Sequence, residues 1–441
     1  MGAMASVRTD ESLPRRFPAW AVDEGNKGDP VDTARQIPLV PFQPLIVCLR
    51  ILGVELDPAI LNESSKCYRY LSWSLGLFSL LSNGLCNIFA GVLGQRKNIY
   101  EHNKAVLSTY NPSLIDGNNS TISSVMSWNL IIDYVNYGVL AFGVHASLFV
   151  ITRQQKWKLL WDNVQQQILQ HHNEFKEISK SIRRLTIAGL LIVILESLWL
   201  ASSPLYFMRL DETHQVLVVI FSKSFSYLFH VYAFCGLLVI ALIGWTVAQG
   251  FRSLHLELKI SSLFTTASDI RPALEKEEMI QKMLTDWKGL HVLLCDAVDG
   301  INDCLGPVLL IWVAHIFVGF IATPFYIFGG FRSSQTTNTT IIALNLSLMV
   351  MLSFHLFVIT GIPSRIWHEA IENGKLLQQV NLKDSNHLQE QVNMLTTEVF
   401  LSLPRVTAME YADLDFSLIP TVIGTCLTYL IILCQFQSSE E

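Results

Sequence analysis

Apolar runs separated by polar segments recur along the chain, and they predict seven membrane-spanning helices. Each run has about 20 mostly apolar residues, which is the length that a helix needs to cross a bilayer. Aromatic residues such as Trp128 and Tyr326 lie near the ends of the runs, where a membrane interface favours them. The predicted spans are residues 68–93, 128–151, 185–208, 215–247, 305–331, 340–363 and 416–436.

The composition indicates that these helices lie in a membrane and not in a soluble core. Hydrophobic residues make up 51% of the chain and charged residues 15%, whereas soluble domains carry about 25% charged residues. We therefore expect an all-α, polytopic membrane protein. Nothing in the sequence resembles a nucleic-acid-binding module, and we expect no nucleic-acid partner.

The positively charged residues predict which side of the membrane each loop faces. Segments 1–67, 152–184, 248–304 and 364–415 together hold 24 Lys and Arg residues, and segments 94–127, 209–214, 332–339 and 437–441 hold five. Such an excess marks the cytoplasmic side. The amino terminus is therefore predicted inside the cell and the carboxyl terminus outside, the reverse of a G-protein-coupled receptor.

Glycosylation sequons agree with this orientation. Asn118 and Asn119 each begin an N-x-Ser/Thr sequence in the loop that is predicted to lie outside. The outer loops contain none of the eight cysteines, so we expect no extracellular disulfide.

The predicted domain organisation follows from the spans. Residues 1–36 are a polar, disordered cytoplasmic tail, and residues 37–247 hold a pre-span or re-entrant segment and spans one to four. A cytoplasmic helical loop (248–304) precedes spans five and six (305–363), and a cytoplasmic anchor helix (364–415) precedes the last span (416–436). Apolar residues at helical spacing predict that the two cytoplasmic helices pack against each other or against copies in neighbouring subunits. These residues are Met279, Met283, Trp287, Leu290 and Leu294 in the first helix, and Ile366, Ala370, Leu377 and Val380 in the second.

The chain contains few of the residue patterns that mark metal sites or catalytic sites. His291 and Cys295, near Asp299 and Asp303, have a spacing that a metal ion accepts, but acids beside an amphipathic helix more often form a solvated face. We predict no metal and no cofactor. No nucleophile elbow, phosphate loop or paired catalytic carboxylates occur, so the sequence does not predict an enzyme.

The last span carries a polar stripe. At 100° per residue, Thr421, Thr425, Thr428 and Gln435 share an arc of roughly 80° on the helix, with Ile432 inside this arc and Phe436 just beyond it. One interpretation is that the threonines bond back to their own helix and Gln435 caps its outer end. The other, which we favour, is that the stripe lines an aqueous path formed by copies of this helix, with Ile432 or Phe436 as a hydrophobic constriction.

The end of this span resembles a family signature. Thr428, Tyr429, five hydrophobic residues (LIILC), Gln435 and Phe436 are similar to the terminal motif of arthropod gustatory receptors, and PLIVCLRILGVEL before the first span resembles the amino-terminal region of that family. The segment TAMEYADLDFSL departs from it. Glu410 and Asp413 stand where many sugar-type members have a glycine and aromatics, which weakens a sugar-receptor assignment.

The resemblance implies a ligand-gated, non-selective cation channel in the plasma membrane of sensory neurons, related to insect odorant receptors. Such receptors are homotetramers, or heterotetramers with related receptors, and they are embedded in membrane lipid. Four copies of the seventh helix surround a pore that passes monovalent and divalent cations. A small tastant, of sugar or bitter type, would bind among the first six spans.

Polar residues in the middle or outer part of the spans are candidates for that ligand site, because such groups are costly in a bilayer. The alternative is that they only hold helices together, and His145, His315 and His355 are predicted to be helix-packing residues. A transporter with a midplane polar site is a second functional class, although the odd number of spans and the lack of a repeat disfavour it. The predicted ligand-binding residues are Asp133, Tyr137, Glu196, Trp199, Lys223, Tyr227, Trp312 and Asn345.

Overall fold

The computed structural model describes residues 42–51, 74, 81, 139–140, 142–170, 172–202, 231, 233–256, 258–259, 273–332, 339–380 and 386–439. All of them belong to one compact unit, Leu39–Glu441. The predicted tail 1–36, most of the first span, the sequons Asn118 and Asn119, and Asp133, Tyr137, Lys223 and Tyr227 lie outside the described residues.

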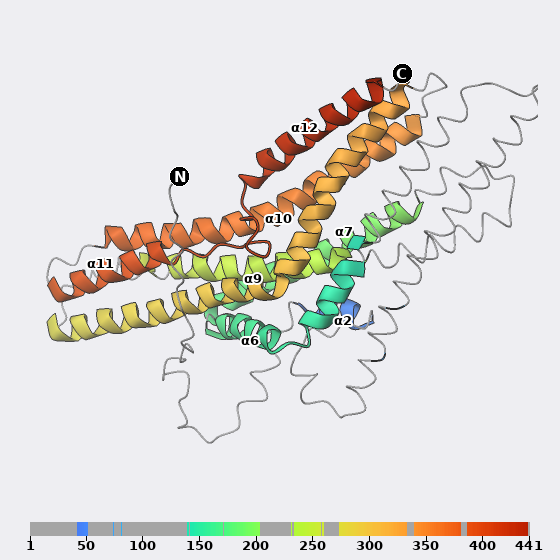
Figure 1. The fold of residues 1–441 in the computed structure, drawn as a ribbon. Coiled ribbons are helices and arrows are strands. Elements are labelled where there is room, and N and C mark those ends of the chain that lie inside the picture. Colours follow the sequence, from blue (N-terminus) through green and yellow to red (C-terminus); the bar gives the residue numbers. More distant parts are fainter. Residues whose placement is uncertain are drawn as a thin grey trace, which may run out of the picture. The chain divides into compact units, whose positions relative to one another are not determined.

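Helices make up nearly all of the described chain, as predicted (Figure 1). The labelled helices are α2 (Gln43–Ile51), α6 (Gln155–Gln170), α7 (His172–Ser202), α9 (Ala273–Arg332), α10 (Thr339–Gln379), α11 (Asn386–Leu401) and α12 (Leu418–Ser439). In the described ranges, three helical segments are long and apolar enough to cross a membrane, namely Ala233–Leu256, Glu277–Phe325 and Asn345–Gln379. Phe142–Ile151 and Leu418–Ile432 are shorter apolar helices.

Helix α9 joins a polar half and an apolar half without a break. Its 60 residues span about 90 Å at 1.5 Å per residue, roughly three times the hydrocarbon thickness of a bilayer. Charged residues are frequent from Glu277 to Asp303 and absent from 305 to 331. The first half therefore extends beyond the hydrocarbon core, and the part of the predicted loop 248–304 that follows Ala273 shares one continuous helix with the predicted fifth span.

The projecting half of α9 packs against α10 and α11, as the amphipathic pattern predicted (Figure 1). Trp287 and Leu294 of α9 are buried, and so are the predicted α10 residues Ile366, Ala370 and Leu377. Lys288 of α9 also pairs with Glu398 of α11, with 2.6 Å between Nζ and Oε2.

One residue of the predicted α9 face lies elsewhere. Met279 is 43% exposed, whereas its neighbour Ile280 is 5% exposed and occupies the buried position. At 100° per residue, Ile280 lies closer than Met279 to the line through Trp287 and Leu294.

Apolar side chains cover the outside of the predicted spans. On α7, Leu191, Ile194, Leu195 and Leu198 are between 52% and 64% exposed, and Val350 of α10 is 70% exposed. In water such a surface would be a large unfavourable patch. It is the surface expected of helices that face lipid.

A glycine allows α9 and α10 to approach closely. A Cβ built on Gly319 would lie 2.6 Å from Leu352 Cδ1, and Leu352 is fully buried. We expect Gly319→Ala to lower the free energy of unfolding by about 1–3 kcal/mol, because Leu352 has nowhere to move. Thermal unfolding of the purified chain in detergent measures this.

Gly361→Ala in α10 is the matched control for that substitution. Its added methyl group would meet Phe416 and Phe357 at 3.7–3.8 Å, an ordinary contact distance. Equal destabilisation by both substitutions would contradict the close approach at Gly319.

Candidate functional site

Helix α12 begins at a well-defined cap. Asp415 Oδ1 accepts a hydrogen bond from the Ser417 backbone N–H at 2.8 Å, which satisfies one of the unpaired donors of the first turn. The Phe416 N–H donates to Ser364 Oγ of α10 at 3.0 Å. Pro420 in the first turn has no backbone N–H, so it needs no hydrogen-bond acceptor. The sequence thus fixes both the start of α12 and its attachment to α10.

One face of α12 packs on α9. Val422 and Cys426 are 6% and 5% exposed, and Cys426 Sγ lies 3.7 Å from the Phe317 carbonyl oxygen. The Tyr429 ring meets Phe317 edge-on with 6.2 Å between the centroids. The face opposite the polar stripe, which holds Val422 and Cys426, is therefore the one that contacts the rest of the chain, although Ile423 on the same side is 42% exposed.

The polar stripe faces away from the helices of its own chain. Thr421, Thr428 and Gln435 are exposed, Thr425 is half-buried, and Ile432 is 39% exposed. Phe436 belongs to α12, but its side chain lies outside the described part of the chain.

Each threonine of the stripe bonds back to its own helix. The hydroxyls of Thr421, Thr425 and Thr428 donate to the carbonyl oxygens of Ser417, Thr421 and Gly424 at 2.9, 2.8 and 2.9 Å. A hydroxyl oxygen has two acceptor positions besides its donor. The stripe therefore presents acceptor oxygens along an exposed face, the chemistry that a partly dehydrated cation needs.

A second polar cluster lies where four helices meet in the predicted membrane region. His355 Nε2 of α10 lies 3.3 Å from Glu196 Oε1 of α7. The Trp312 ring of α9 meets the His355 ring at 5.0 Å between centroids, in an edge-to-face arrangement. Phe234 of the Ala233–Leu256 helix lies 5.4 Å from His355 and 5.9 Å from Trp312. His315, one turn beyond Trp312, packs edge-on against it at 5.7 Å.

This cluster is buried, and part of its hydrogen-bonding capacity is unused. Trp312 and His355 are 0% and 1% exposed, and the Glu196 side chain is 14% exposed. Trp312 Nε1 and His355 Nδ1 have no hydrogen-bond partner among the residues that the structure describes. Buried polar atoms of this kind normally bond to protein, water or ligand.

The structure brings together only part of the predicted ligand-binding set. Glu196 and Trp312 meet in the cluster, and Asn345 lies about 15 Å before His355 along α10. Trp199 belongs to α7, but its side chain is outside the described part.

Sequence reasoning placed His355 among the packing histidines and not with the ligand residues. A signal was available, because Glu196 is the one charged residue of the predicted third span and His355 the one titratable residue of the sixth. Two isolated titratable residues in apolar spans are natural partners.

Two residues of the possible metal site meet, with 3.6 Å between His291 Nε2 and Cys295 Sγ, whereas Asp303 has a partner elsewhere. His291 stacks on Trp287 with 5.3 Å between centroids, and Asp303 pairs with Lys156 of α6 at 2.7 Å. Asp303 raises the pKa of Lys156 through this hydrogen bond. Burial raises the pKa of the Cys295 thiol to about 12, which disfavours the thiolate that binds metals. Within the described ranges, no three His, Cys, Asp or Glu residues are grouped to hold a metal ion.

Comparison with known proteins identifies the family. Residues 66–440 match the family described as 7tm Chemosensory receptor, and no curated protein sequence matches the chain. The olfactory receptor OR5 of the insect Machilis hrabei has the same fold, with a TM-score of 0.60 and 10% identity over 92% of this chain and 99% of that one.

OR5 in complex with eugenol is equally similar, with a TM-score of 0.59 and 10% identity over 92% of this chain and 98% of that one. The continuous match to the family, together with the helical fold that the chain shares with an insect olfactory receptor, shows that it belongs to the 7tm chemosensory receptor family.

Proposed function

We propose that this protein is a gustatory receptor that acts as a ligand-gated, non-selective cation channel, opened by a small tastant of sugar or bitter type. Four copies, or this chain with related receptors, would surround one pore in the plasma membrane of a sensory neuron. The observation that carries the proposal is the orientation of α12, whose apolar face packs on α9 while its polar stripe is exposed.

The energetics of the stripe support an aqueous path between copies. Polar side chains in membrane helices face protein or water and not lipid. Symmetry-related copies of α12 would place Thr421, Thr425, Thr428 and Gln435 around a common axis, with Ile432 and Phe436 as apolar constrictions. Hydroxyl and amide groups replace part of an ion's hydration without binding it tightly, so monovalent and divalent cations would pass.

The four-helix cluster is the proposed ligand site. It combines aromatic rings with the carboxylate of Glu196 and with Trp312 Nε1 and His355 Nδ1, which have no hydrogen-bond partner within the part of the chain that the structure describes. Aromatic faces next to hydrogen-bonding groups suit both sugars and heterocyclic bitter compounds. The related receptor OR5 binds the small aromatic molecule eugenol, which supports a small-molecule site in a protein of this fold.

Recording from cells that express the chain alone tests the function. The test applies sucrose, fructose, caffeine, quinine and eugenol. A channel gives ligand-evoked current with discrete openings and a reversal potential that reports poor selectivity among cations. Saturable flux without openings would favour a transporter instead.

Glu196→Gln tests whether the cluster binds ligand or only holds helices. It keeps the size of the side chain and removes its charge. If Glu196 contacts ligand, the half-maximal concentration of the active compound should rise by about tenfold or more, because a charged hydrogen bond is worth about 1.5–3 kcal/mol. The amount of receptor at the cell surface should not change.

Loss of surface receptor with an unchanged half-maximal concentration would instead assign Glu196 a purely structural role. Glu369→Gln in α10 is the control. It removes a half-buried carboxylate from an i,i+4 pair with Arg365, away from the cluster, and should not affect the half-maximal concentration.

A further inference from the structure

The connection between α11 and α12, residues 402–417, is held on α9 by two side chains: Cys295, whose Sγ lies 3.7 Å from the Ser402 carbonyl oxygen, and Asn302. We call this segment the linker. Asn302 Nδ2 donates to the Arg405 carbonyl oxygen at 2.8 Å, and Asn302 Oδ1 accepts from the Thr407 N–H at 2.8 Å. The amide of Asn302 thus pairs with the linker backbone as a neighbouring strand would, with both its donor and its acceptor in use.

The linker makes a tight, strained turn against the same face of α9. Met409 and Glu410 have φ of 53° and 62°, a left-handed conformation that is unfavourable for residues with a Cβ. Arg405 and Asp413 close the turn with 2.6 Å between Nη1 and Oδ2. A Cβ on Gly306, one turn after Asn302, would lie 3.2 Å from the Met409 nitrogen. The turn therefore depends on the surface of α9 that Asn302 and Gly306 form, which we call the seat.

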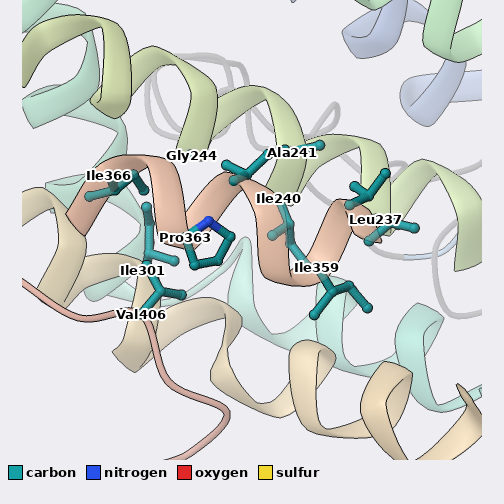
Figure 2. A pocket seen from close by; sticks show the side chains of 11 residues that line it. Leu237, Ile240, Ala241, Gly244, Ile301, Ile359, Pro363, Ile366 and Val406 are labelled. Carbon is teal, nitrogen blue, oxygen red and sulfur yellow. The ribbon is translucent and has the colours of Figure 1, made fainter. Parts of the chain in front are cut away.

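A small apolar cavity lies beside this seat. Ile301 of α9, Pro363 of α10 and Val406 of the linker gather at one end of it (Figure 2). Its free space of about 10 Å³ is on the order of what one water needs, so it is too small for a ligand. It leaves the linker under-packed on one side, next to the proline that interrupts the hydrogen bonds of α10. Val406 of the linker thus borders a small void beside Pro363.

We propose that Asn302 is a positioning residue of a latch through which α9 and α10 set the position of α12. This inference rests on the proposed channel function. Helices α9 and α10 carry Trp312 and His355 of the ligand cluster, and the same two helices hold the linker through Asn302 and Ser364. A shift of α9 relative to α10 at the cluster therefore changes the seat of the linker, and with it the first turn of α12.

Variants that move the latch in opposite directions test the proposal. Asn302→Leu removes both hydrogen bonds, and Gly306→Ala pushes the turn away without removing a polar group. Glu410→Gly favours the seated turn, because glycine adopts positive φ without penalty. The measured quantity is the half-maximal concentration of whichever compound of the sucrose, fructose, caffeine, quinine and eugenol panel is active. It should shift by about fivefold in one direction for Asn302→Leu and Gly306→Ala, and in the opposite direction for Glu410→Gly. The ion permeability ratios should stay as in the unmodified chain.

Asn373→Leu is the matched control. Asn373 is buried and donates to the Phe251 carbonyl oxygen at 2.9 Å, so its loss removes a similar bond between helices without touching the linker. It should reduce surface expression and leave the half-maximal concentration unchanged. Shifts in one common direction for Asn302→Leu and Glu410→Gly, or no shift in either, would overturn the latch while leaving the channel function intact.

Hydrogen exchange on the purified full chain tests the latch without measuring ligand-evoked current. Asn302→Leu should speed exchange of the amides from Thr407 to Glu410 and in the first turn of α12, and Glu410→Gly should slow it. If the unmodified chain conducts with none of the compounds, the proposed function fails. Unchanged exchange in the first turn of α12 would show that Asn302 does not position this helix.

Discussion

Replacing Gln435 by Ala should change which ions pass through the channel. In the proposed pore, the amide of Gln435 replaces part of the hydration shell of a passing cation. Its loss should change the permeability of Ca²⁺ relative to Na⁺ by about threefold or more, since a single hydrogen-bonding group is worth about 1 kcal/mol. Reversal potentials under exchanged bath solutions measure this directly, and the half-maximal ligand concentration should move little.

Leu427→Ala is the control for Gln435→Ala. Leu427 is 53% exposed on α12 but lies outside the polar arc, so its truncation should leave permeability unchanged. Identical permeability and block in the Gln435 variant and the unmodified chain would show that α12 does not line the pore. A change in the Leu427 variant alone would place a different face of α12 at the pore.

Replacing Trp312 by Ala should cause the largest loss of stability among the substitutions considered. Trp312 is fully buried and contacts rings from two other helices. Its truncation leaves a cavity at the meeting point of four helices, at a cost of about 3–5 kcal/mol. We expect a lower unfolding temperature in detergent and little receptor at the cell surface.

The cavity left by Trp312→Ala offers a specific rescue. Indole has the shape of the missing side chain, so it should raise the unfolding temperature of this variant and leave the unmodified chain unchanged. Trp367→Ala serves as comparison, because Trp367 is 39% exposed and its loss should change the free energy of unfolding by only about 0.5 kcal/mol. Equal losses for the two variants would contradict the central place of Trp312 in the packing.

The apolar faces of helices could be predicted from the periodic spacing of residues in the sequence. The apolar face of α12 that packs on α9, and the faces of α9 and α10 that pack together outside the membrane, follow from residue spacing alone. Helical periodicity needs no knowledge of the partner, since an apolar face must be buried against something. The error at Met279 shows the limit, because two adjacent apolar residues leave the centre of a face uncertain by up to 100°.

Contacts between distant segments were not predictable. Asn302 is an ordinary polar residue in a helix until the linker, about 100 positions later, returns to it. Charge alone suggests that Lys223 pairs with Glu196 or with Asp133. Lys223 and Asp133 lie outside the described residues, and Glu196 contacts His355. The sequence shows that an isolated charge in a span needs a partner, but the choice among candidates depends on helix positions that no local pattern encodes.

The back-bonded threonines of α12 have a consequence for how the protein is made. In the proposed pore, α12 must enter lipid before other copies of the chain can surround it. Because Thr421, Thr425 and Thr428 each give their hydroxyl proton to their own helix, the helix carries no unpaired threonine donor into the hydrocarbon, and its insertion costs less. The same residues are therefore compatible with lipid during insertion and with water after assembly of the proposed pore. A single subunit can thus stay folded in the bilayer before it assembles.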